Sequence, residues 1–103
     1  MAGEIARRFA LLSEPMRIRI IDTLRERGEA SVQEIADALG ATHANVSKHL
    51  NILLAAGIVD RRKSGTKAIY RVADEGVFRL CEDVCGGIAE RARTLGALFE
   101  PAA

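Results

Sequence analysis

Apolar residues recur three and four positions apart over most of the chain, which is the spacing that places side chains on one face of a helix. Four such segments precede residue 57, with inward-facing positions at Ile5, Phe9 and Leu12; at Met16, Ile20, Ile21 and Leu24; at Val32, Ile35, Ala36 and Leu39; and at Val46, Leu50, Leu53 and Leu54. A fifth segment, from Glu75 onward, carries a longer stripe at Val77, Leu80, Cys81, Val84, Ile88, Leu95 and Leu98. The pattern therefore predicts five helices.

Residues that cap helices stand between these segments. Ser13 and Pro15 suit the end of the first helix and the start of the second, and Ser31 and Glu34 have the spacing of a capping box. A short glycine-containing turn at residues 40–42 joins the third and fourth helices. Two short helices joined in this way are typical of a helix-turn-helix.

After residue 57 the pattern changes to two runs rich in β-branched residues, 58–62 and 68–72, around a turn at Ser64-Gly65-Thr66. The predicted fold is mainly α with a small β-hairpin, a winged helix-turn-helix of five helices plus a two-stranded wing. We expect one domain over 1–103, with dimerisation helices at 1–13 and 74–100, the helix-turn-helix at 31–56 and the wing at 58–72.

The charges are unevenly distributed, although the net charge is only +1. Residues 43–73 carry six Lys or Arg against one Asp, a net charge of +5, whereas residues 1–42 and 74–103 have net charges of −1 and −3. A local excess of positive charge within a balanced chain is typical of a nucleic-acid contact, although a solvated basic loop has the same composition.

Several blocks in the same order resemble the ArsR/SmtB family of bacterial winged-helix repressors, over roughly residues 9–90. They are Leu12-Ser13-Glu14-Pro15-Met16-Arg17-Ile18-Arg19-Ile20, Val32-Gln33-Glu34-Ile35-Ala36-Asp37-Ala38-Leu39-Gly40, Asn45-Val46-Ser47-Lys48-His49-Leu50, Leu54-Ala55-Ala56-Gly57-Ile58-Val59 and Gly65 with Tyr70-Arg71-Val72. The resemblance implies a homodimer packed through its first and last helices that binds a palindromic operator in double-stranded DNA. It also implies release from DNA by a metal ion, a metalloid or an oxidant.

In a helix-turn-helix the second helix enters the major groove with its N-terminal turns facing the bases. The polar residues expected to meet the DNA are Thr42, His43, Asn45, Ser47, Lys48 and His49. The wing residues expected on a phosphate backbone or in the minor groove are Arg61, Arg62, Lys63 and Lys67. Four or five phosphate contacts per protomer would give a log–log salt slope near −8 for the dimer. Each residue also has a purely structural interpretation, as a solvated position or, for Thr42, as a helix cap.

The sites by which the family senses metals are incomplete in this sequence. Ser31 and Gln33 stand where the family's thiolate box would have cysteines, so that site is missing. Asp74 and Glu90 match carboxylate positions of the last-helix zinc site, but glycines stand at Gly76 and Gly87, where that site would have histidines. Carboxylates without imidazole make a poor zinc site.

Cys81 and Cys85 lie one helical turn apart and are the remaining candidate ligands. Two thiolates in this arrangement could bind a thiophilic ion such as arsenite, cadmium or copper(I), with a partner chain completing the coordination, and they are also open to oxidation. The alternative is that Cys81 is a small buried apolar residue and Cys85 lies at the margin of the same stripe. The sequence leaves both interpretations open.

Other function classes are less well supported. His43 and His49 lie about 120° apart around a helix and lack a suitably spaced carboxylate, so we expect no enzyme. Two alternative functions stay open: a repressor that responds to no effector, and a module that binds another protein. No apolar run approaches the length of a membrane span, and the N-terminus has no signal pattern, so we expect a cytoplasmic protein with reduced thiols and no membrane partner.

Overall fold

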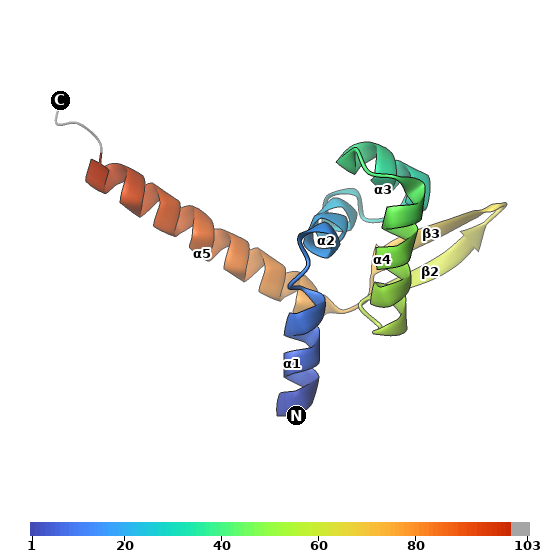
Figure 1. Ribbon diagram of the computed structural model, residues 1–103, viewed down its shortest axis with the longest axis horizontal. Helices are drawn as coiled ribbons and strands as arrows, with labels where there is room; N and C mark the ends of the chain where they lie inside the picture. The colour runs from blue at the N-terminus through green and yellow to red at the C-terminus, as the bar shows by residue number, and fades with distance from the viewer. Residues whose placement is uncertain (100–103) are drawn as a thin grey trace.

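The five predicted helices and the hairpin are present in the computed structural model, which describes residues 1–99, with side chains to residue 96 (Figure 1). In chain order the elements are α1 (Ala2–Leu11), α2 (Pro15–Arg27), β1 (Ala30–Ser31), α3 (Val32–Leu39), α4 (His43–Ala55), β2 (Val59–Ser64), β3 (Lys67–Val72) and α5 (Glu75–Phe99). The expected ends of the last helix at residue 100 and of the domain at residue 103 lie outside the described residues, as does the side chain of Leu98. No helix in the described part of the chain is long and apolar enough to cross a membrane.

Local capping interactions set most helix boundaries. The capping box is confirmed, because the Ser31 hydroxyl accepts from the Glu34 N–H at 3.2 Å and the Glu34 carboxylate accepts from the Ser31 N–H at 3.0 Å. Pro15 begins α2 as expected, but the side chain of Glu14, and not that of Ser13, caps this helix by accepting from the Met16 N–H. The Ser13 hydroxyl instead donates to the Ala10 carbonyl at the end of α1.

The sheet has three strands in the order β1-β3-β2, so the expectation of two strands was incomplete. Ala30 pairs with Tyr70 and Ser31 with Ile69, both antiparallel. A strand of two residues has no hydrophobic alternation, and Ser31 already carries the signal for the start of α3. This pairing attaches the base of the wing to the segment that leads into the helix-turn-helix.

The hydrophobic core lies around α2, which contacts α3, α4, α5 and β3. Its fully buried side chains include Ile20, Ile21, Leu24, Ile35, Val46, Leu50, Leu53, Ile58 and Val59. Met16, Leu39 and Leu54, which were expected in the core, are partly buried and pack against its edge. This core holds α3, α4 and the base of the wing in one rigid arrangement, because closely packed protein interiors resist displacement.

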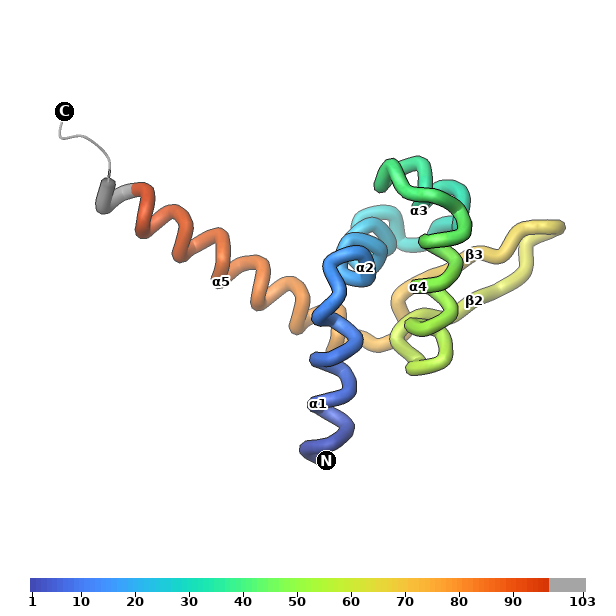
Figure 2. Tube along the Cα trace, in the orientation of Figure 1, coloured from blue at the N-terminus to red at the C-terminus, as the bar shows by residue number. Residues whose placement is uncertain are grey.

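Helix α5 projects away from this core, and α1 extends in a different direction (Figure 2). The molecule measures 59 × 36 × 20 Å and has a radius of gyration of 16.4 Å, whereas a compact chain of this length has one of about 13 Å. The start of α5 is anchored by the buried Val77 and by Phe78, whose ring lies 6.0 Å from the Arg25 guanidinium. Both projecting helices leave large apolar side chains exposed: Ile5, Phe9, Val84, Ile88 and Leu95.

Candidate nucleic-acid interface

The turn between α3 and α4 sets the direction of α4. Gly40 ends α3 with φ at +63°, a left-handed conformation that glycine adopts without a steric penalty. Thr42 then caps α4, with its hydroxyl accepting from the Asn45 N–H at 3.1 Å. The buried stripe of α4 packs against α2 and α3. The predicted helix-turn-helix is therefore present, and Thr42 has the capping role that was its structural alternative.

The outer face of α4 carries most of the residues predicted to meet DNA. Thr42, His43 and Lys48 are exposed, and Asn45 and Ser47 are partly buried at the edges of this face. The sequence interpretation missed Asn51, which is also exposed. Asn51 lies four residues after Ser47 and three after Lys48, so helical spacing alone places it on their side. We call Thr42, His43, Asn45, Ser47, Lys48 and Asn51 the α4 polar face.

His49 is not part of this face, so its prediction as a residue facing DNA was wrong. Its side chain is only 7% exposed and faces α2, where Nδ1 accepts a hydrogen bond from Arg17 Nε at 3.2 Å. Burial, the Arg17 charge and the Lys48 charge hold the pKa of His49 below its ordinary value, against a smaller opposing effect of Glu14. The sequence contained the signal for this burial, because His49 lies three residues after Val46 and four before Leu53, on the buried stripe.

The wing carries its cations on two faces. Cross-strand partners project from the same side of a sheet. Arg61 pairs with the buried Tyr70 and Lys63 with Ala68, so both project on the core side of the wing. Arg62 and Lys67 project on the opposite side, as their pairing with Ile69 and Ser64 requires. The four predicted cations therefore cannot contact one flat surface together.

Two of the wing arginines are already paired with acids. Arg62 Nη2 lies 2.7 Å from Glu29 Oε1, and Arg71 Nη2 lies 3.6 Å from Asp60 Oδ2. Within the described residues, Arg61, Lys63 and Lys67 form no ion pair. All three are exposed, so they are the wing cations available to a polyanion.

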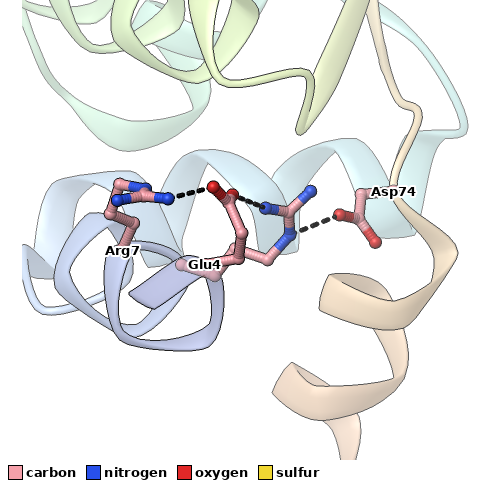
Figure 3. A network of polar contacts seen from close by, with 4 residues as sticks. Glu4, Arg7 and Asp74 are labelled. Carbon is pink, nitrogen blue, oxygen red and sulfur yellow. Dashed lines mark hydrogen bonds and ion pairs between the residues drawn. The ribbon is translucent and has the colours of Figure 1, made fainter. Parts of the chain in front are cut away.

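The junction of α1 and α5 is held by a polar network (Figure 3). The Arg8 guanidinium contacts Asp74 at 3.1 Å and Glu4 at 3.7 Å, and Glu4 also pairs with Arg7. Asp74 caps α5 by accepting from the Val77 N–H at 3.1 Å. Partial burial alone would raise the pKa of Asp74, but the hydrogen bonds from Val77 and Arg8 outweigh it and lower the pKa. The Asp74 carboxylate therefore has a structural role at this junction.

Asp74 and Glu90 of one chain do not form a zinc site together. Asp74 and Glu90 are separated by sixteen residues of one helix, which is about 24 Å at 1.5 Å per residue, so one chain cannot bring them together. The described residues contain no group of three or more His, Cys, Asp or Glu side chains that could hold a metal ion.

Cys81 and Cys85 lie on an apolar groove of about 510 Å³ between α1, the start of α2 and α5. The groove is lined by Phe9, Leu12, Ile18, Leu80, Cys81, Val84, Cys85, Ile88 and Ala89. Cys81 is partly buried and Cys85 is exposed, and neither forms a disulfide. Burial raises the pKa of the Cys81 thiol, an effect that Asp22 adds to and Arg25 opposes. The alternative in which Cys81 belongs to the edge of the core agrees with this position.

Comparison with known sequences points to transcriptional regulators. Residues 12–62 match a family model described as a helix-turn-helix domain. The chain is 40% identical over 91 residues to the HTH-type transcriptional repressor SmtB of Mycobacterium tuberculosis, an alignment that covers 88% of this chain and 64% of SmtB. The chain thus spans somewhat less than two thirds of the length of this curated relative.

Comparison with solved structures agrees. A homodimeric winged helix-turn-helix DNA-binding domain from Mycobacterium bovis, described as a possible ArsR-family transcriptional regulator, superposes with a TM-score of 0.76 at 35% identity, covering 86% of this chain and 82% of that one. The antimony-specific transcriptional repressor AntR superposes with a TM-score of 0.84 at 29% identity, covering 89% and 83%.

Proposed function

The chain belongs to the ArsR/SmtB family of winged helix-turn-helix repressors, and from this premise we propose that it is a cytoplasmic transcriptional repressor that binds operator DNA as a homodimer. The observation that carries the proposal is the α4 polar face, which stands exposed on a helix fixed from behind by a packed core, beside a basic wing. A rigid helix of this kind is what insertion into a major groove requires.

The α4 polar face supplies the groups that distinguish base pairs. An asparagine can form two hydrogen bonds to adenine, and a lysine favours guanine or phosphate. We assign base contacts to Asn45 and Asn51 and a base or phosphate contact to Lys48. His43 and Ser47 lie beside them and complete the face. These contacts specify sequence, whereas the wing contacts position the protein.

The wing supplies sequence-independent affinity through Arg61, Lys63 and Lys67. Among the described residues, these are the predicted wing cations that form no ion pair. With Lys48 they make four cations per protomer and eight per dimer. Arg62 is not counted among these cations because it already forms an ion pair with Glu29. Eight neutralised phosphates correspond to a log–log salt slope of about −7.

The dimer follows from the exposed apolar face formed by α1, the start of α2 and α5. We propose that a second copy of the chain covers the groove that contains Phe9 and Ile88. The elongated shape of the single chain leaves this face without an internal partner. Two copies then present two α4 helices to the half-sites of a palindrome.

We propose that release from DNA, where it is controlled by an effector, acts through Cys81 and Cys85. One chain supplies only two thiols, so a thiophilic metal or metalloid ion needs ligands from the second copy as well. Both cysteines line the proposed dimer face, where a bound ion or an oxidised sulfur changes the packing between copies. Replacing both by serine and measuring DNA release by arsenite, cadmium, copper(I) and peroxide tests this proposal. Release that is unchanged in the double variant identifies a repressor that does not sense through its thiols.

Selection from a random duplex library tests the central proposal. The wild-type protein is expected to enrich a palindromic duplex and to bind it with the salt slope given above. Asn45→Ala should reduce the preference for that duplex over random DNA, whereas Lys67→Ala should weaken binding to both equally. Failure to enrich any duplex, together with weak binding that ignores ionic strength, would identify a protein-interaction module instead.

A further inference from the structure

Arg17 joins three helices through one guanidinium group. Its Nε donates to His49 Nδ1 in α4 at 3.2 Å, and its Nη1 donates to the Leu11 carbonyl at the end of α1, also at 3.2 Å. Arg17 itself lies in the first turns of α2. The carbonyls in the last turn of a helix have no partner within the helix, so this contact also satisfies an otherwise free acceptor of α1.

The contact with His49 requires a single protonation state. Arginine is permanently charged and can only donate, so Nδ1 of His49 must offer a lone pair and the ring must be neutral with its proton on Nε2. Adding a proton to Nδ1 would place two N–H donors and two positive charges against each other at this distance. The hydrogen bond therefore exists only while His49 is unprotonated.

His49 is placed where its contact links the orientation of α4 to Arg17. It lies on the buried stripe between Val46 and Leu50, directly after Lys48, which is on the α4 polar face. A turn of α4 about its axis that removes His49 from Arg17 also turns this face. The other end of the connection, Leu11, adjoins Leu12, which lines the groove of the proposed dimer face.

We infer that Arg17 is a positioning residue that, through His49, sets the orientation of α4 relative to α1 and so connects the dimer face to the DNA-binding face. This inference rests on the proposed function. It predicts that protonation of His49 releases α4 and lowers affinity for DNA. Such a loss is opposite to the usual effect of acid, because added positive charge strengthens binding to a polyanion.

The surroundings of His49 keep the ring neutral near pH 7. The charges that act on it are Arg17 and Glu14 from α2 and Lys48 from its own helix; among the described residues, α3 and β2 add none. Burial, Arg17 and Lys48 lower the pKa and only Glu14 raises it. A lowered pKa means that folding favours the neutral ring, so the contact is retained at pH 7 and is lost only as the pH falls through the lowered pKa, below the ordinary value for histidine.

His49→Gln is the decisive variant, because its amide oxygen can accept from Arg17 and cannot be protonated. Affinity for a duplex selected by the wild-type protein is measured at constant salt over a pH series from 7.5 downward. We expect wild type and H49Q to bind within threefold of each other at pH 7.5, and wild type to bind at least tenfold more weakly than H49Q once the pH is one unit below the lowered pKa of His49. His43→Gln is the matched control and should retain the acid-induced loss. Identical pH profiles for wild type and H49Q would overturn the inference.

Arg17→Met tests the other partner, since it keeps the aliphatic stem and removes the donors. We expect it to bind the duplex at least tenfold more weakly at pH 7.5 and to lose the acid response. Arg19→Met removes the same charge from an exposed position two residues away and should change affinity less than threefold. Equal losses of affinity in both variants would show that the loss follows from the change in net charge, and would contradict the inference.

A measurement without DNA separates the two proposals. Nitrogen NMR of the wild-type His49 ring should show the Nε2–H tautomer and a pKa below that of free histidine, and Arg17→Met should raise the pKa and mix the tautomers. If wild type shows this signature but enriches no duplex, the proposed function fails while the contact stands. If wild type binds DNA but the ring titrates normally, the inference fails alone. Should Arg17→Met not fold, as judged by circular dichroism, H49Q decides.

Discussion

Replacing Ile88 by alanine removes an apolar group from the face that we propose a second copy of the chain covers. Ile88 lies on the projecting part of α5, is 66% exposed and lines the groove of the proposed dimer face. Alanine is the strongest helix former, so the substitution does not weaken α5 itself. Any loss is therefore expected in association and not in the folding of the single chain.

The size of the effect follows from the exposed fraction of the side chain. The substitution removes three side-chain carbons, worth about 2.4 kcal/mol when fully buried at about 0.8 kcal/mol each. Since two thirds of the side chain is exposed in the single chain, about 1.6 kcal/mol of this is gained only on association. Twofold symmetry counts the position twice, so the dimer loses about 3.2 kcal/mol, or roughly 200-fold in its dissociation constant.

Sedimentation equilibrium over a range of protein concentrations measures this constant directly. Glu90→Ala is the matched control, because it truncates an exposed side chain two residues away on the opposite side of α5 and should change the constant less than threefold. A dissociation constant for Ile88→Ala within threefold of wild type would refute the assignment of this face to the dimer. An equal loss in both variants would show that α5 acts through charge or helix content and not through apolar contact.

Three further substitutions test the fold and the interface. Ser31→Ala removes one half of the capping box and should lower the free energy of unfolding in urea by about 1 kcal/mol, with Gln33→Ala, which leaves the cap intact, as the control. Asp74→Ala should cost about 1–2 kcal/mol at pH 7 from the lost cap and ion pair. The pKa of Asp74 is lowered, so this difference should persist above the ordinary pKa of aspartate and disappear as the pH falls through the lowered pKa; a difference that grows in acid would contradict the assignment. Lys63→Ala should make the salt slope of the dimer shallower by about 2, whereas Arg62→Ala, whose charge Glu29 already pairs, should change it less.

Much of the fold was predictable because its signals are local. The capping box at Ser31 and the cap at Thr42 involve residues three positions apart, and both occur as the spacing indicates. Ser13 and Glu14 are adjacent and can both cap a helix, and only the backbone geometry selects Glu14 at the start of α2. The strand β1 was missed because its two residues gain order from pairing with β3, forty residues away in sequence.

The candidate site was predicted less completely. The α4 polar face follows from helical spacing, but His49 was assigned to it on residue type, although its spacing from Val46 and Leu53 places it on the buried stripe. The partners that change the roles of Arg62 and Asp74 lie 33 and 66 residues away, as Glu29 and Arg8. No local pattern identifies such pairs.

The sequence by itself determined the five helices and the hairpin, their order, the caps at Ser31 and Thr42, and the concentration of positive charge in the middle of the chain. These properties depend on interactions within a few residues and on sums over a segment. The tertiary structure alone decided which cations are already paired with acids, and that α5 extends from the body. Those outcomes depend on which distant groups come into contact, because a side chain's neighbours in space determine its charge partner, its solvation and its freedom to bind.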